Sequence, residues 1–181
     1  NPTGGEIIVH TKFGEKKING KKPNQVTELG LARTFQNIRL FQNMTVMENV
    51  MIGRHCRTRS NVIGALFRDP HTKSEEMKSA EICYELLKKM GLDHLSQEMA
   101  SNLPYGAQRK LEIARALATE PVLLLLDEPA AGMNPQETED LTGLIREIRD
   151  KDKIAIMLIE HDMKLVMNLS NRIYVMDHGQ R

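Results

Sequence analysis

The sequence predicts an α/β protein with a parallel sheet, and three observations support this fold class. Residues 122–126 and 154–159 form two short apolar runs, with the length and composition of strands that are buried on both faces. Between them lies a segment whose apolar residues recur at helical spacing. A further helix-forming segment, residues 110–117, precedes the first run. The stripe of the intervening helix consists of Leu141, Leu144, Ile145 and Ile148.

The first 42 residues are expected to contain β structure. Strands are predicted around residues 6–10 and 32–36, with turns at Gly4-Gly5 and Asn19-Gly20. The lysines of this region are interpreted as the solvated surface of a hairpin: Lys12, Lys16, Lys17, Lys21 and Lys22.

Residues 43–102 are expected to be mainly helical. Thr45 and Glu48 have the spacing of a capping box, and Thr72 repeats that spacing with Glu75 before a second helix. This second helix should end near Met90, where Gly91 can stop it. Residues 55–70 are predicted to form a polar loop or short helix. The stripe of the second helix, interpreted as core, is Cys83, Leu86, Leu87 and Met90.

Residues 103–181 are predicted to be α/β. Asn134 should cap the helix that Pro135 starts, and Asp162 should cap the helix after the second apolar run. Residues 172–177 are predicted to form one more strand, closed by His178-Gly179.

Length and composition limit the classes of function that this chain can have. A chain of 181 residues can bury a core and favours one domain, and a net charge of +1 with 27% charged residues gives no bias toward nucleic acid. Cys56 and Cys83 fit no metal-ligand spacing and are interpreted as reduced thiols. The sequence contains no apolar run of about 18 residues, so membrane association is expected to come from a partner.

Two acids follow the first apolar run, in the sequence Leu-Leu-Leu-Leu-Asp127-Glu128-Pro. Ligands of open α/β sheets bind at the carboxyl ends of the strands. In a phosphate-cleaving enzyme, Asp127 would hold Mg²⁺ and Glu128 would polarise the attacking water. The alternative is a core strand that ends in two solvated acids, and the motif alone does not decide between the two.

Two other segments could touch a phosphate. Residues 103–109 form a turn with a glycine at the entrance of a helix, whose amino terminus attracts anions. His161 follows the second apolar run. Taken singly, the turn is compatible with an ordinary helix cap and the histidine with a structural role.

In combination and in this order, these residues resemble the ATPase subunit of an ABC transporter over essentially the whole chain. Gln36 matches the Q-loop glutamine, residues 123–128 match the Walker B strand, and His161 matches the switch histidine. Residues 130–134, which end in Asn134, match the D-loop. The signature Leu-Ser-Gly-Gly-Gln is represented by Leu103 and then by Pro104, Tyr105, Gly106, Ala107 and Gln108.

Longer strings are similar to the branched-chain amino acid importers within this family. They include Arg-Thr-Phe-Gln36 and the segments 127–135 and 159–167. The ATPase subunits of amide and urea importers share much of this sequence. The resemblance implies a P-loop NTPase (RecA-like) core with a helical subdomain. Residues 1–42 would be a partial core region with the Q-loop, residues 43–102 the helical subdomain, and residues 103–181 the signature helix and Walker B core.

The resemblance also implies a mechanism that uses ATP and Mg²⁺. Glu128 would be the catalytic base, Asp127 and Gln36 would serve Mg²⁺, and Gln36 and His161 would sense the γ-phosphate. The signature turn would contact ATP held by a second ATPase subunit, identical or different. The assembly would act on a transmembrane permease at the cytoplasmic face of the cell (inner) membrane, with a periplasmic or extracellular binding protein and without nucleic acid.

The permease contact is expected in the helical region. Arg39, Phe41 and Met44, within residues 37–50, are suited to hold a short helix of the permease. The alternative is that Phe41 and Met44 belong to the core.

Two features depart from the family pattern. No Gly-x-x-x-x-Gly-Lys-Ser/Thr loop occurs in the sequence, so we expect an internal fragment that lacks the amino-terminal part of the core and does not hydrolyse ATP by itself. In the signature turn, Pro104 replaces the serine and has neither a hydroxyl nor an N–H, and Ala107 stands at the glutamine position.

Two other functions remain open from the sequence. A non-transport ABC ATPase would normally show tandem ATPase domains or long coiled-coil insertions, which are not visible here. A non-catalytic interaction module would fit the missing phosphate loop, but Glu128 and His161 argue against it.

Overall fold

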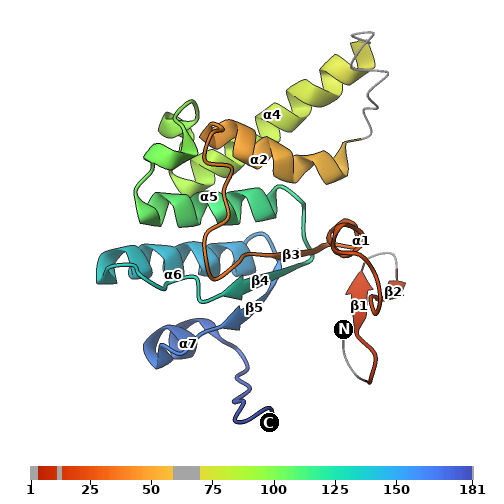
Figure 1. The fold of residues 1–181 in the computed structure, drawn as a ribbon, viewed down its shortest axis with the longest axis vertical. Helices are drawn as coiled ribbons and strands as arrows, with labels where there is room; N and C mark the ends of the chain where they lie inside the picture. Colours follow the sequence, from red (N-terminus) through yellow and green to blue (C-terminus); the bar gives the residue numbers. More distant parts are fainter. Residues whose placement is uncertain (1–3, 12–13, 59–69, 181) are drawn as a thin grey trace.

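The computed structural model describes residues 4–11, 14–58 and 70–180. Its centre is a parallel sheet with the strand order β3-β4-β5, formed by Leu31–Arg33, Leu123–Asp127 and Ala155–Ile159 (Figure 1). Leu31 is paired with Leu123, and Leu123 with Ala155. All three strands run in the same direction, so their carboxyl ends lie at one edge of the sheet. The predicted α/β class with a parallel sheet is confirmed.

A separate hairpin precedes the sheet. It consists of β1 (Ile8–Thr11) and β2 (Gly14–Lys17), which pair antiparallel and lead to the short helix α1 (Pro23–Glu28). The predicted solvated lysines are exposed at positions 16, 17, 21 and 22, while Lys12 lies outside the described residues.

The described residues of the region 43–102 are mainly helical, as predicted. Helices α2 (Val46–Arg54), α4 (Pro70–Met90) and α5 (Tyr105–Leu117) pack against one another in pairs. The capping box at Thr45 is confirmed, because its hydroxyl accepts from the Glu48 N–H at 3.1 Å and Glu48 Oε2 accepts from the Thr45 N–H at 2.7 Å. Short 3₁₀ turns complete this region: η1 (His55–Arg57), η2 (Asp93–Leu95) and η3 (Ala100–Asn102).

The start of α4 differs from the prediction. The helix begins at Pro70, so Thr72 lies within its first turn and is not the cap. Proline is favoured in the first turn because its missing N–H would have no partner there, and this outweighs the threonine signal. In the segment predicted as loop or short helix, η1 is a short helix and residues 59–69 lie outside the described residues.

Gly91 ends α4 as predicted. Its φ is +70°, which side chains disfavour and glycine tolerates. The N–H of Leu92 bonds to the Leu87 carbonyl at 2.8 Å, and the N–H of Gly91 bonds to the Lys88 carbonyl at 3.0 Å. This pair of bonds is a Schellman cap, which satisfies carbonyls that the helix end would otherwise leave unpaired.

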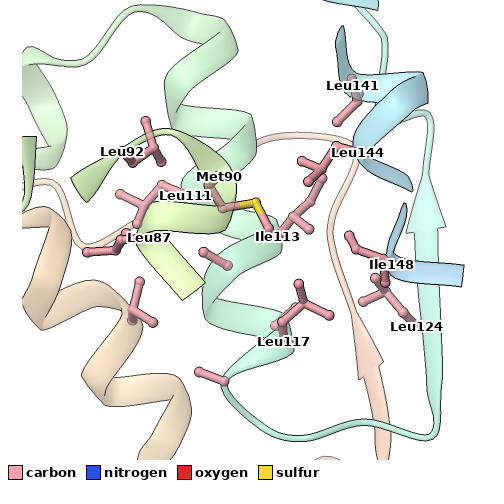
Figure 2. Packing of buried hydrophobic residues seen from close by; sticks show 14 of the residues in the cluster. Leu87, Met90, Leu92, Leu111, Ile113, Leu117, Leu124, Leu141, Leu144 and Ile148 are labelled. Atoms are coloured by element: carbon pink, nitrogen blue, oxygen red, sulfur yellow. The ribbon is translucent and has the colours of Figure 1, made fainter. Parts of the chain in front are cut away.

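One hydrophobic core joins the helical region to the sheet. Figure 2 shows α5 between the two, with Leu111 near the α4 residues Leu87 and Met90, and with Ile113 and Leu117 directed toward α6 (Pro135–Asp150) and β4. The predicted core stripes of α4 and α6 are therefore confirmed. Buried members of those stripes are Cys83, Leu87, Met90, Leu141, Leu144, Ile145 and Ile148.

The sheet is covered unequally on its two faces. Leu124 and Leu126 of β4 are buried toward the helices, whereas the alternate residues Leu123 and Leu125 are only half-buried. On β5, Met157 and Ile159 are 54% and 50% exposed. Within the described part of the chain, this second face therefore presents apolar side chains to solvent.

The carboxyl-terminal segment corrects one prediction. After α7 (Met163–Leu169), which Asp162 caps as predicted, residues 172–177 do not form a strand. Their apolar residues Ile173 to Met176 are 42–73% exposed, and Asp177 makes only an isolated bridge to Gln180. A strand requires a hydrogen-bonded neighbour, and this segment pairs with none of the strands in the described residues.

No helix in the described residues is long and apolar enough to span a bilayer.

Candidate active site

The carboxyl edge of the sheet brings three predicted site residues together. Gln36 follows β3, Glu128 follows β4 directly, and His161 follows β5. Gln36 Nε2 lies 2.8 Å from Glu128 Oε2, and His161 Nδ1 lies 3.6 Å from Glu128 Oε1. The Glu128 carboxylate thus lies between an amide and an imidazole.

The backbone at Glu128 is strained. Its φ is +44°, a left-handed conformation that is uncommon for residues other than glycine. Hydrogen bonds hold it there, because the Glu128 N–H bonds to the Ile159 carbonyl at 2.9 Å and the Ala131 N–H bonds to the Glu128 carbonyl at 3.2 Å. Such strained residues cluster at functional sites, where surrounding contacts maintain them.

Solvent reaches this site from the side of His161. The His161 side chain is 79% exposed, whereas that of Glu128 is 26% exposed. A water molecule can therefore approach a carboxylate that is itself largely shielded. This arrangement suits a carboxylate that accepts a proton from water.

Asp127 lies beside this group and pairs with a residue that the sequence did not single out. Arg33 Nη2 is 2.8 Å from Asp127 Oδ2, and the Asp127 side chain is 20% exposed. The carboxylate of Asp127 and the amide oxygen of Gln36 are the hard oxygen ligands that Mg²⁺ prefers, and phosphates normally complete such a site. Among the described residues, no cluster of three or more His, Cys, Asp or Glu side chains could hold a metal alone. The oxygen donors of Asp127 and Gln36 are chemically suited to Mg²⁺, and a phosphate group would supply further ligands.

The predicted signature turn forms the amino terminus of α5. Pro104 is the residue before the helix and provides no side-chain cap, and the Gln108 amide donates to the Leu103 carbonyl at 2.9 Å. The first backbone N–H groups of the helix belong to Tyr105, Gly106 and Ala107, and they can face an anion.

This turn lies against the loop that follows Glu128 and against the start of α6. A Cβ added to Gly132 would lie 3.4 Å from the Tyr105 ring, and a Cβ added to Gly106 would lie 2.6 Å from Glu137 Oε1, so both glycines leave room for these close neighbours. Asn134 ends the same loop and caps α6 as predicted, because its side-chain oxygen accepts from the Glu137 N–H at 2.9 Å.

Two further residues were missed by the sequence analysis. Arg109 and Glu112 lie on α5, are buried, and contact the backbone around Gln36. The available signal was a pair of opposite charges at i and i+3 next to the apolar stripe of a helix. A third missed residue, Arg115, donates to the Arg39 carbonyl, and burial lowers the pKa of its guanidinium.

Comparison with known proteins supports the resemblance. A family profile described as ABC transporter matches residues 1–131. The high-affinity branched-chain amino acid transport ATP-binding protein LivG of Salmonella typhimurium is 43% identical over 178 residues, which cover 98% of this chain and 68% of LivG. The corresponding protein BraF of Pseudomonas aeruginosa is 41% identical, with the same coverage of both chains. The chain thus spans about two thirds of the length of these relatives.

A solved structure agrees in fold. The ADP conformation of an ATP-binding cassette of an ABC transporter superposes with a TM-score of 0.74 and 33% identity. The match covers 91% of this chain and 64% of that chain, which is less than two thirds of its length. The predicted ABC ATPase fold is therefore confirmed, and the chain belongs to the ABC transporter family.

Proposed function

We propose that this chain is part of the ATP-hydrolysing subunit of an importer of branched-chain amino acids. Family membership supports an ATPase, and the names of LivG and BraF support the transported class. The single observation that carries the enzymatic part is the contact of Gln36 and His161 with one carboxylate, that of Glu128.

Each residue has a role in this proposal. Glu128 accepts the proton of the attacking water, and Gln36 and His161 orient that water and contact the γ-phosphate. Asp127 and Gln36 would hold Mg²⁺, and Arg33 pairs with the Asp127 carboxylate in this structure. A bound Mg²⁺ supplies charge stabilisation for the phosphate oxygens.

The signature turn serves a second subunit. The backbone N–H groups of residues 105–107, together with the side chains of Pro104, Tyr105 and Gln108, face the nucleotide that a second ATPase subunit holds. The exposure of Pro104 and Tyr105 supports this arrangement. Asn134 stabilises the adjacent D-loop by capping α6.

We further propose the division of the chain and its place in the cell. Residues 1–42 form a partial core region with the Q-loop, residues 43–102 the helical subdomain that contacts a transmembrane permease, and residues 103–181 the signature helix and Walker B core. The subunit works at the cytoplasmic face of the cell (inner) membrane, bound to the permease, which receives its solute from a periplasmic or extracellular binding protein. The exposure of Phe41, which is 48%, supports a partner surface rather than a core position.

Transport by the reconstituted assembly tests this function. Proteoliposomes should contain the permease, its binding protein and an ATPase subunit in which residues 1–181 follow a phosphate-binding loop. We expect uptake of radiolabelled leucine, isoleucine and valine that depends on Mg²⁺ and ATP, with little uptake of urea or acetamide. Uptake of urea or acetamide in preference to leucine would contradict the proposed substrate class, and ATP hydrolysis without any solute uptake would contradict a role in transport.

A further inference from the structure

A buried ion pair on α5 holds the loop that carries Gln36. Arg109 and Glu112 are 0% and 2% exposed, and Arg109 Nη1 lies 2.8 Å from Glu112 Oε2. They are separated by three positions on one helix, so the helix itself fixes their relative position.

The other contacts of this pair reach the backbone on both sides of Gln36. Arg109 Nη1 donates to the Phe35 carbonyl at 2.7 Å, and Nη2 donates to the Gln36 carbonyl at 2.8 Å. Glu112 Oε1 accepts from the N–H groups of Phe35 and Arg39, each at 3.4 Å. The two side chains therefore bind two carbonyls and two N–H groups within residues 35–39. We call this arrangement the α5 clamp.

Stability alone does not account for the clamp. Taking two charges out of water is costly, and apolar residues of similar volume often replace a buried ion pair without loss of stability. Arg109 Nε is buried and has no hydrogen-bond partner among the described residues, which adds to this cost. What apolar residues cannot supply is the fixed geometry of a guanidinium and a carboxylate against backbone groups.

The clamp connects the two functional regions of the chain. Helix α5 begins at the signature turn, where the Tyr105 hydroxyl lies 3.5 Å from Arg109 Nη2. At the other end, the side chain of Gln36 bonds to Glu128. A continuous set of contacts thus runs from the signature turn through Arg109 and Gln36 to Glu128.

We propose that Arg109 and Glu112 are positioning residues that tie the orientation of α5 to the position of Gln36, and through Gln36 to Glu128. This inference rests on the proposed function of Glu128 as the base. When the signature turn engages the nucleotide of a second subunit, the clamp carries the resulting shift of α5 to the Q-loop of the same chain. Hydrolysis at Glu128 then depends on whether the signature turn is engaged.

The test uses Arg109→Lys in an ATPase subunit in which residues 1–181 follow a phosphate-binding loop. A lysine keeps the charge beside Glu112, but its single ammonium cannot hold the Phe35 and Gln36 carbonyls in the fork geometry of arginine. We expect the variant to fold with a lower melting temperature, because the Phe35 and Gln36 carbonyls lose a buried partner. The ATP dissociation constant should be unchanged and kcat lower by roughly 10-fold or more, the scale of a misplaced active-site group. The control Lys110→Gln changes the adjacent position of α5, which lies outside the clamp, and should retain the kcat of the unmodified subunit.

A double-mutant cycle separates positioning from a general structural effect. If the clamp acts through Gln36, Arg109→Lys should cause no further loss of kcat in a Gln36→Ala background, whereas independent effects would multiply. If Arg109→Lys does not fold, the apolar pair Arg109→Met with Glu112→Leu takes its place. A folded variant with unchanged kcat, multiplying losses in the cycle, or failure of both variants to fold would overturn the proposal. An unmodified subunit that hydrolyses no ATP would instead overturn the proposed function.

Discussion

Gln36 and Glu128 are 92 positions apart in the chain, yet the Gln36 amide nitrogen lies 2.8 Å from a Glu128 carboxylate oxygen. Their strands, β3 and β4, are hydrogen-bonded neighbours that run in the same direction. The contact is therefore a direct consequence of sheet order, and it places the loop that leads into the helical region against the proposed base.

This contact predicts the effect of Gln36→Ala in the phosphate-loop-containing subunit. Loss of the amide should lower kcat by roughly 10- to 100-fold, because Glu128 and the attacking water lose an orienting partner. The steady-state rate of phosphate release measures this effect. Gln136→Ala is the matched control, since it truncates an exposed glutamine on α6 whose amide contacts Asp140, and it should leave kcat unchanged. Equal rates of phosphate release for Gln36→Ala and the unmodified subunit would show that Gln36 does not contribute to catalysis.

The exposed ring of Phe41 leads to a prediction about coupling. Phe41 is 48% exposed, and the centre of its ring lies 5.6 Å from Cζ of the Arg115 guanidinium. In the assembled transporter, Phe41→Glu should lower leucine uptake more than it lowers the ATPase activity of the isolated subunit, because it places a charge in the proposed permease surface. Equal loss of both activities, together with a lower melting temperature, would favour the alternative that Phe41 has a core role.

The capping box of α2 gives a stability prediction. Thr45→Ala removes the hydroxyl that accepts from the Glu48 N–H, and it should lower the free energy of unfolding by about 1 kcal/mol. Thr45→Ser retains a hydroxyl and should lose little, as chemical denaturation can show. The Thr45 N–H lowers the pKa of Glu48, so the contribution of this carboxylate is present at neutral pH and is lost as the pH falls through the lowered pKa. A Thr45→Ala variant as stable as Thr45→Ser would refute the role of this cap.

The two cysteines should differ in reactivity and in their effect on stability. Burial raises the pKa of Cys83 to about 11, and Cys56 is only half-buried. A thiol reagent at pH 8 should therefore label Cys56 first, and Cys83 only after unfolding.

Cys83 also gives the direction of a pH dependence. In the unfolded chain its thiol ionises near pH 9.0, whereas in the folded chain it keeps its proton up to about pH 11. Its contribution to stability is thus fully present below pH 9 and is lost as the pH rises through 11. Denaturation curves across this range should show the loss in Cys56→Ser but a smaller loss in Cys83→Val. Rapid labelling of Cys83 in the folded protein would contradict its buried position.

Features that depend on neighbouring residues were predictable from the sequence. The caps at Thr45, Asn134 and Asp162 use contacts within three residues, so the residue types at these positions suffice to predict them. The gathering of Gln36, Glu128 and His161 follows from one additional rule, that the carboxyl ends of parallel strands share an edge.

Features that depend on distant packing were not predictable. The predicted strand at residues 172–177 contains the apolar run 173–176, but a strand also needs a hydrogen-bonded neighbour, which composition cannot show. The contacts of Arg109 and Glu112 with the Gln36 loop join distant positions, since Arg109 and Gln36 are 73 residues apart in the chain. An i, i+3 charge pair on a helix normally indicates a solvated surface, so its burial emerged only from the fold.

The substitution Glu128→Gln tests whether Glu128 is the base of an ATPase. The substitution keeps the size of the side chain but removes the group that accepts the proton. In the subunit that carries a phosphate-binding loop, we expect the hydrolysis rate to fall by roughly 100-fold or more, the scale of general-base effects. ATP binding should persist, and ATP-bound dimers should accumulate.

Two controls make this measurement decisive. Glu139→Gln makes the same chemical change at an exposed position of α6 and should hydrolyse ATP at the unmodified rate. A polypeptide of residues 1–181 alone, whose sequence contains no phosphate-binding loop, should show no activity above background. We expect the Glu128→Gln subunit to bind ATP tightly and to hydrolyse it very slowly, whereas unchanged hydrolysis would show that Glu128 is not the base.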